Sequence, residues 1–330
     1  MKKKKYLLNK LDALHTYTHN GVLKPKKETI KSYKKILVSG RCMKKIGFIG
    51  IGLMGLPMAK HLINSGYEVH GFDINPQQMA EAENSGVVIH SNLQSIAKSG
   101  QIVLLNLPTF KAVKDVVFGE NGIANVIQAP QCVIDFSTNP VSEGRELIEL
   151  FRKQTSCTWI DAPVSGGPAA SACGKLTVML GAMPDEYSSN EKLLKTIAGQ
   201  LTLMGPPGSG LVAKALNQLI VGCLHAVIAE AASIAKKSGI DANLVPTALS
   251  GGHADGVLLQ QIFPRMMAND FAPRGYARQL LKDLDMVTSY ASELKVPTPM
   301  TSQALTLYRI LIEMGHSELD TTSILKVIQR

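Results

Sequence analysis

The sequence predicts an α/β domain built on a doubly wound parallel sheet, followed by an all-α C-terminal domain. Short apolar runs that are typical of buried strands alternate with helical segments through the first part of the chain. After about residue 208 the strand-like runs stop, and only helical periodicity continues. A chain of 330 residues, 45% of them hydrophobic, is long enough to bury the cores of two such domains.

The alternation begins near Met43. The first run, 45–50, ends in glycine, and Gly66 is expected to stop the helix that follows over 56–65. Further strand-like runs lie at 67–73, 102–107, 132–136, 158–163 and 176–180. Helices are expected at about 209–238, 241–250, 254–268, 276–294, 298–315 and 319–329. The first of these is apolar on more than one face, which predicts that it is deeply buried.

These patterns divide the chain into a basic leader over 1–42, an α/β domain over 43–206 and a helical domain over 207–330. The formal net charge is +9, but the leader carries +10 of it and the remainder −1. The charge therefore does not indicate a nucleic-acid partner for the folded part. Because the leader lacks the apolar segment of a secretory signal, we expect a disordered tail or a translation start placed too early. A targeting or polyanion-binding role is the alternative.

The cysteine and hydropathy patterns favour a cytoplasmic protein without a metal site or a membrane span. None of the five cysteines forms a C-x-x-C pair, which suits reduced thiols and gives no zinc motif. The longest apolar stretch, 216–235, is interrupted by polar side chains and falls short of an uninterrupted membrane span.

A dinucleotide-binding turn is predicted directly after the first strand. The segment Gly50-Ile51-Gly52-Leu53-Met54-Gly55 fits G-x-G-x-x-G between a strand and a helix, which is the Rossmann pattern. In this pattern the first glycine allows the tight turn and the second lets the pyrophosphate approach the backbone. The third lets helix and strand pack closely. Free N–H groups at the helix N-terminus then bind the phosphates.

The cofactor is expected to be NAD. Asp73 ends the second strand, where a carboxylate can bind both ribose hydroxyls and repel a 2′-phosphate. No Arg or Lys follows it to hold such a phosphate. Since ligands lie beyond the carboxyl ends of the strands in open α/β sheets, we expect Leu107, Pro108 and Thr138 to line the same cleft.

Two later segments resemble the β-hydroxyacid dehydrogenase family, which includes 3-hydroxyisobutyrate dehydrogenase and 2-hydroxy-3-oxopropionate reductase. Residues 161–167, Asp-Ala-Pro-Val-Ser-Gly-Gly, are similar to the family's substrate motif. Residues 208–218, Gly-Ser-Gly-Leu-Val-Ala-Lys-Ala-Leu-Asn-Gln, are similar to its catalytic motif. The turn at 46–55 and Lys282-Asp283-Leu284 also match, so the resemblance covers 43 to about 328.

The resemblance implies a role for each matching residue. Lys214 exchanges a proton with the substrate oxygen, as an acid in carbonyl reduction and a base in alcohol oxidation. Asn217 and Gln218 lie one turn further along the helix, where one of them orients the lysine or holds the substrate. Lys282 reaches the cofactor side. From the residues themselves, Ser165, Gly166 and Gly167 offer a hydroxyl and open N–H groups for a substrate carboxylate, and burial is expected to lower the pKa of Lys214.

The predicted activity is reversible hydride transfer between NAD and a short 3-hydroxy acid or its semialdehyde, as in 3-hydroxyisobutyrate dehydrogenase. A 2-hydroxy-3-oxopropionate reductase, or another semialdehyde or glyoxylate reductase, is the alternative. A non-catalytic nucleotide-binding module on the same scaffold is the alternative from another class. The expected partners are a small carboxylate substrate and further copies of the chain in a homodimer or homotetramer, with no metal, nucleic acid or membrane.

Overall fold

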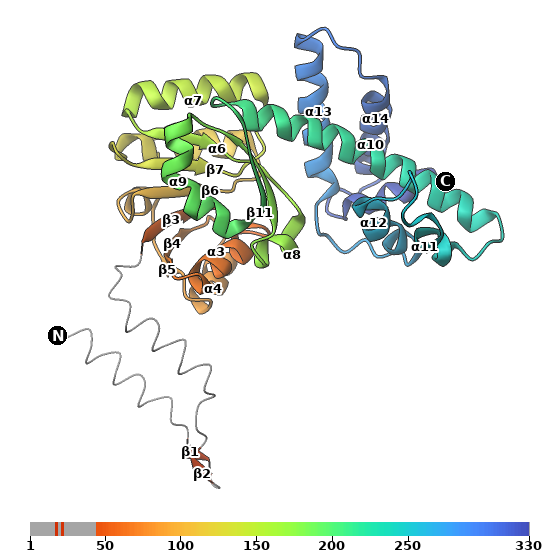
Figure 1. The fold of residues 1–330 in the computed structure, drawn as a ribbon, viewed down its shortest axis with the longest axis horizontal. Coiled ribbons are helices and arrows are strands. Elements are labelled where there is room, and N and C mark those ends of the chain that lie inside the picture. Colours follow the sequence, from red (N-terminus) through yellow and green to blue (C-terminus); the bar gives the residue numbers. More distant parts are fainter. Residues whose placement is uncertain (1–16, 19–20, 23–43, 330) are drawn as a thin grey trace. The chain divides into compact units, whose positions relative to one another are not determined.

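The computed structural model describes residues 17–18, 21–22 and 44–329 (Figure 1). The first two pairs form the short antiparallel strands β1 (Tyr17–Thr18) and β2 (Gly21–Val22). The expectations for the leader otherwise lie outside the described residues. Residues from Lys44 onward form one compact unit, which contains both the sheet and the C-terminal helices.

A nine-stranded sheet organises the first part of this unit, in the order β11-β10-β8-β7-β6-β3-β4-β5, with β9 beside β10. The strands predicted from the sequence are β3 (Lys45–Ile49), β4 (Glu68–Phe72), β6 (Ile102–Leu105), β7 (Cys132–Asp135), β8 (Thr158–Asp161) and β10 (Leu176–Gly181). Three strands were not predicted: β5 (Val88–Ile89), β9 (Val164–Ser165) and β11 (Ala198–Gly205). The sheet is parallel from β5 to β8, but β10 runs antiparallel to β8 and β9, so it is mostly rather than wholly parallel.

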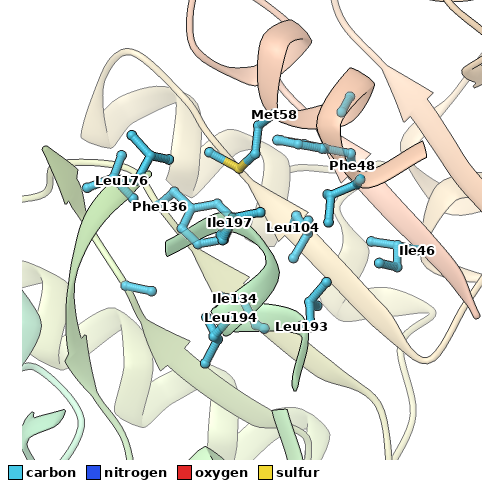
Figure 2. Close-up of a cluster of buried hydrophobic side chains, with 14 of the residues drawn as sticks. Ile46, Phe48, Met58, Leu104, Ile134, Phe136, Leu176, Leu193, Leu194 and Ile197 are labelled. Atoms are coloured by element: carbon cyan, nitrogen blue, oxygen red, sulfur yellow. The ribbon is translucent and has the colours of Figure 1, made fainter. Parts of the chain in front are cut away.

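Helices cover both faces of the sheet, as a doubly wound fold requires. On one face, α3 (Gly55–Asn64) and α9 (Pro184–Ile197) pack on the apolar side chains of the central strands. Figure 2 shows this core, in which Met58 and Ile197 lie among Phe48, Leu104 and Phe136. On the other face lie α5 (Leu93–Ala97), α6 (Phe110–Phe118) and α7 (Val141–Thr155). The remaining helices of this part are α4 (Pro76–Asn84), η1 (Ile123–Asn125) and α8 (Gly167–Ala172).

The second part is helical throughout, as predicted. The 29-residue helix α10 (Ser209–Lys237) begins beside β10 and β11 and continues among the remaining helices (Figure 1). These are η2 (Ala242–Leu244), α11 (Val245–Leu249), α12 (Val257–Met267), α13 (Ala277–Glu293), α14 (Pro299–Glu313), η3 (Thr321–Ile324) and α15 (Leu325–Ile328). They share a core centred on Phe263, Leu284 and Tyr308.

Deep burial of α10 was expected, but it is only partly confirmed. One face of the helix is buried, whereas a second apolar face is exposed and is formed by Leu216, Ile220, Leu224, Val227 and Ile234. These side chains recur every three or four residues, apart from a gap of seven before Ile234, so they form one stripe. Helix α10 is also the one helix among the described residues that is long and apolar enough to cross a membrane, by length and composition alone.

Candidate active site

The turn at Gly50–Gly55 has the geometry that its glycines predict. Gly50 has φ +91°, and a Cβ there would lie 2.3 Å from the Asn106 carbonyl oxygen. A Cβ at Gly55 would lie 2.1 Å from the Gly50 carbonyl oxygen. At Gly52 nothing lies within 4 Å of a built Cβ, so its backbone faces open space. Two glycines therefore pack the turn tightly and the third leaves an approach to the backbone, which fits a pyrophosphate at the start of α3.

Asp73 lies beside this turn. Its Oδ2 accepts a hydrogen bond from the backbone N–H of Ile51 at 2.8 Å, and its Oδ1 accepts one from Asn75 at 2.9 Å. These bonds hold the carboxylate at the carboxyl ends of β3 and β4. Ile74, the next residue, is 90% exposed and apolar. The residues present therefore fit an adenosine ribose with free hydroxyls.

The other expected cofactor contacts lie at the same edge of the sheet. Leu107 follows β6, and its backbone N–H donates to Ser137 Oγ at 2.9 Å, which ties the ends of β6 and β7 together. Pro108 next to it is exposed, and so is Leu53 in the glycine turn. The carbonyl oxygen of Met54 accepts a hydrogen bond from Ser171 on α8 at 2.9 Å. The nucleotide turn is thus joined to the segment that follows Ser165–Gly167.

The turn at Ser165–Gly167 separates β9 from α8. Gly166 has φ +127° and Gly167 has φ +72°, conformations that favour glycine. All three residues are partly or fully accessible, and nothing lies within 4 Å of a Cβ built on Gly167. The turn therefore presents an accessible hydroxyl and backbone, as a carboxylate site needs.

Lys214 lies in the second turn of α10 and is 7% exposed. Its Nζ donates a hydrogen bond to the backbone carbonyl of Val164 at 2.9 Å, directly before Ser165. Burial lowers the pKa of Lys214 to about 8, the nearby carboxylate of Asp283 raises it, and the ammonium of Lys282 lowers it. The lowered pKa agrees with the expectation from the sequence, and it makes this lysine suitable for proton transfer near neutral pH.

Asp161, which was not predicted as a site residue, fixes the start of α10. Its Oδ1 accepts a hydrogen bond from the N–H of Gly208 at 2.7 Å, and its Oδ2 accepts one from Leu211 at 3.0 Å. Burial raises the pKa of Asp161 to about 6, while these backbone bonds lower it. The two carboxylate oxygens accept backbone N–H groups at the positive end of the helix, which favours the ionised form. The two resembling segments, 161–167 and 208–218, are thus joined by these two bonds and by the bond from Lys214 to Val164.

Asn217 and Gln218 bind each other and a third residue. Asn217 Nδ2 donates to Gln218 Oε1 at 2.8 Å, and Gln218 Nε2 donates to Asp283 Oδ2 at 2.5 Å. Lys282, the neighbour of Asp283 on α13, donates to the Thr138 carbonyl oxygen at 3.1 Å. A small cavity lies at this junction, and its lining includes Thr138, Ala215, Gln218 and Asp283. The structure therefore brings these predicted residues together where the sheet meets the helices.

His225 of α10 has a structural environment. It is buried and bonded to the Val221 carbonyl oxygen and to Thr321 Oγ1. Within the part of the chain that the structure describes, no group of three or more His, Cys, Asp or Glu side chains could hold a metal ion.

Comparison with known proteins identifies the family. Residues 45–205 match the model described as the NAD binding domain of 6-phosphogluconate dehydrogenase, and residues 208–328 match the NAD-binding domain of NADP-dependent 3-hydroxyisobutyrate dehydrogenase. The 2-(hydroxymethyl)glutarate dehydrogenase of Eubacterium barkeri is 30% identical over 86% of this chain and 94% of its own. The chain belongs to the β-hydroxyacid dehydrogenase family.

Two further relatives agree with this assignment. The L-threonate dehydrogenase of Cupriavidus necator is 28% identical over 86% of this chain and 96% of its own length. The solved structure of a Mycobacterium tuberculosis 3-hydroxyisobutyrate dehydrogenase with L-serine is 26% identical, with a TM-score of 0.77 over 88% of this chain and 100% of that one. This β-hydroxyacid dehydrogenase family member is therefore an NAD(P)-dependent oxidoreductase that acts on CH–OH groups.

Proposed function

We propose that this family member is an NAD-dependent dehydrogenase of a short 3-hydroxy acid, which it interconverts with the corresponding semialdehyde. The observation that carries the proposal is the position of Lys214. Its ammonium group is buried and lies 2.9 Å from the carbonyl oxygen of Val164, beside the accessible turn at Ser165–Gly167. A carboxylate held at that turn would bring the hydroxyl or carbonyl of a three- to five-carbon acid toward Lys214.

Each residue then has one task in the reaction. Ser165 and the two glycines bind the substrate carboxylate through a hydroxyl and backbone N–H groups. In alcohol oxidation the neutral amine of Lys214 takes the hydroxyl proton, and in carbonyl reduction its ammonium returns that proton to the oxygen. NAD, when bound at Gly50–Gly55, supplies the chemistry of hydride acceptance and donation. Asn217 and Gln218, one turn after the lysine, are hydrogen-bonded to each other, and Gln218 also fixes the carboxylate of Asp283.

The preference for NAD over NADP rests on Asp73. Its carboxylate is held beside the glycine turn by Ile51 and Asn75. A 2′-phosphate at the adenosine ribose would face this negative charge, and the residues that follow, Ile74 and Asn75, offer it no cation.

Substrate identity within the class depends on the groups around the α-carbon. 3-Hydroxyisobutyrate carries a methyl group there, whereas 2-hydroxy-3-oxopropionate carries a hydroxyl group. A hydroxyl group needs a hydrogen-bond partner when it is buried, so the two substrates require different walls. A panel of both compounds, with L-threonate and glyoxylate added, separates the candidates by kcat/KM.

The exposed apolar stripe on α10 supports a homodimer or homotetramer. Ile220, Leu224 and Val227 are each more than 40% exposed on one helix face. A stripe of this kind is typical of a surface that another protein covers.

The cysteines that the structure describes are Cys132, Cys157, Cys173 and Cys223, and all four are free thiols. This supports the cytoplasm as the site of action.

The decisive experiment compares two lysine variants of the same helix. Lys214→Ala should keep cofactor binding, measured by the fluorescence of NADH, and lose turnover by about three orders of magnitude, since general acid–base catalysis contributes roughly 10²–10⁴-fold. Lys236→Ala is the control, because Lys236 is exposed in the last turn of α10. Near-normal kcat in Lys214→Ala would refute the proposal.

A further inference from the structure

Asp283 belongs to a buried polar cluster with Gln218, and the proposed reaction gives this carboxylate no task of its own. It is 6% exposed on α13, and its Oδ2 accepts the hydrogen bond from Gln218 Nε2. Gln218 is one helical turn after Lys214 on α10, and its own Oε1 is occupied by Asn217. The Gln218 amide therefore links the two residues: its Nε2 donates to the Asp283 carboxylate and its Oε1 accepts from Asn217.

The second oxygen of Asp283 belongs to an ion pair. Lys282 Nζ lies 3.0 Å from Asp283 Oδ1, and the same ammonium donates to the Thr138 carbonyl oxygen at the end of β7. The side chain of Lys282 is 27% exposed, and that of Asp283 is 9% exposed. The pair is thus better shielded from water than the surface pairs of the same helix, so its charges interact more strongly.

The ammonium groups of Lys214 and Lys282 repel each other, and the carboxylate of Asp283 attracts both. The positive charge of Lys282 opposes that of Lys214, while the negative charge of Asp283 favours it. The other charged groups near α10 act elsewhere. Asp161 of β8 is bonded to the helix N-terminus, Arg145 of α7 lies against Gly208, and Arg265 and Asp320 act at His225.

We propose that Asp283 is a positioning residue for Lys214: hydrogen-bonded to Gln218 and paired with Lys282, it supplies the negative charge that lets two ammonium groups share this buried site. This inference rests on the proposed function, in which Lys214 exchanges the proton. Without the carboxylate, Lys282 would repel the charged form of Lys214 with no compensation. The protonated state needed for carbonyl reduction would then be less populated.

The test measures the titration of Lys214 directly in the full chain, without cofactor or substrate. Lysine is labelled with ¹³C at Cε, and the Lys214 resonance is assigned by its loss in Lys214→Met. In Asp283→Asn the titration midpoint should fall by about one pH unit, since an opposite charge nearby shifts a pKa by roughly 1–3 units. Asp285→Asn is the matched control, because Asp285 is exposed two residues further along α13 and pairs with Arg309. A midpoint in Asp283→Asn equal to that of the wild type overturns the proposal.

A second variant keeps the test decisive if Asp283→Asn does not fold. Lys282→Met removes the opposing ammonium and leaves the carboxylate, so the Lys214 midpoint should rise by about half a unit. An unchanged or lower Lys214 midpoint would contradict the proposed charge coupling between Lys214, Lys282 and Asp283. Because the resonance is measured without turnover, it is independent of Lys214→Ala kinetics. If Lys214→Ala keeps its activity, the proposed function is refuted. The NMR titrations of Lys214 in the Asp283 and Lys282 variants still test the charge coupling in that case.

The kinetic consequence separates positioning from a purely structural role. In Asp283→Asn the pH midpoint of alcohol oxidation should move down with the Lys214 resonance, whereas Asp285→Asn should keep the wild-type profile. A variant that merely loses folded protein would lower kcat at every pH without moving the midpoint.

Discussion

The carboxylate of Asp161 accepts a hydrogen bond from the backbone N–H of Leu211, three residues before Lys214, at 3.0 Å. The two residues are 50 positions apart in the sequence, at the end of β8 and in the first turn of α10. Three residues after Asp161, the Val164 carbonyl oxygen accepts the hydrogen bond of Lys214. One short segment therefore sets both the start of the helix and the position of its ammonium group.

We expect Asp161→Asn to disturb the start of α10 and the position of Lys214 without weakening cofactor binding. An Asn keeps one acceptor oxygen but turns an N–H group toward the N–H groups of Gly208 or Leu211, so a buried donor loses its partner. This should destabilise the fold by about 2 kcal/mol and reduce kcat by at least about tenfold, with little change in the Kd for NAD. Urea unfolding and steady-state kinetics measure the two effects. Asp241→Asn, which alters the exposed N-cap of η2, is the control and should leave kcat unchanged.

Gly210→Ala should be harmful for a steric reason. In an ordinary helix position this change stabilises by up to about 1 kcal/mol. A Cβ at Gly210 would lie 2.5 Å from the Met179 carbonyl oxygen and 2.8 Å from that of Asp161, both backbone atoms that cannot move alone. Gly210→Ala should therefore destabilise the protein instead of stabilising it, with a lower Tm and a lower kcat. Gly256→Ala, where nothing lies within 4 Å, is the comparison; equal Tm changes in both variants would contradict the close approach.

Much of the fold could be predicted because its strands and helices have local signals. The run Ile46–Ile49 is apolar and ends in glycine, and it forms the buried β3 as expected. By contrast, β11 was missed because most of its residues are exposed, so Leu201, Thr202 and Leu203 give no alternation of buried and exposed sides. Its pairing with β10 depends on residues more than 20 positions earlier. The antiparallel direction of β10 likewise has no local signal.

The positions of some site residues could be predicted from the local sequence. The glycine turn and Asp73 are an example, since they follow two neighbouring strands and lie side by side; their contacts with a cofactor stay a prediction. The tasks of Asp161 and Asp283 were not predictable, because each depends on contacts with α10 that form only in the folded chain. An acidic residue within an otherwise apolar strand-like run is the one signal that could have drawn attention to Asp161.

The two reaction directions should depend on pH in opposite ways. The pKa of Lys214 is lowered to about 8 by burial. Alcohol oxidation needs the neutral amine, so kcat/KM should rise as the pH rises through about 8 and then level off. Carbonyl reduction needs the ammonium, so kcat/KM should fall over the same range. Initial rates from pH 6 to 10 in both directions check this, with enzyme re-assayed at pH 7.5 to exclude inactivation. Profiles that rise or fall together would contradict the proton role of Lys214.

If copies of the chain assemble through the apolar stripe on α10, one charged side chain in the stripe should dissociate the oligomer. Ile220 is 56% exposed in the stripe, so Ile220→Asp places a carboxylate where a second copy would cover it. We expect the variant to dissociate into monomers in light scattering after size exclusion, at a concentration where the wild type is a dimer or tetramer. Leu150→Asp is the control, because Leu150 is similarly exposed on α7, outside the stripe. A wild-type monomer, or loss of assembly in both variants, would count against the stripe.

The cofactor preference should be reversible at Asp73. Since its carboxylate is held beside the ribose site by Ile51 and Asn75, the wild type should have the higher kcat/KM with NAD. Asp73→Ser removes the charge that binds the ribose hydroxyls, so KM for NAD should rise by about tenfold to a hundredfold, because hydrogen bonds to charged groups contribute about 1.5–3 kcal/mol. Adding Ile74→Arg supplies a cation for the 2′-phosphate and should make NADP the better cofactor. Ile74→Gln on the wild-type background controls for the loss of the exposed side chain. If the wild type already prefers NADP, the carboxylate does not select the cofactor as proposed here.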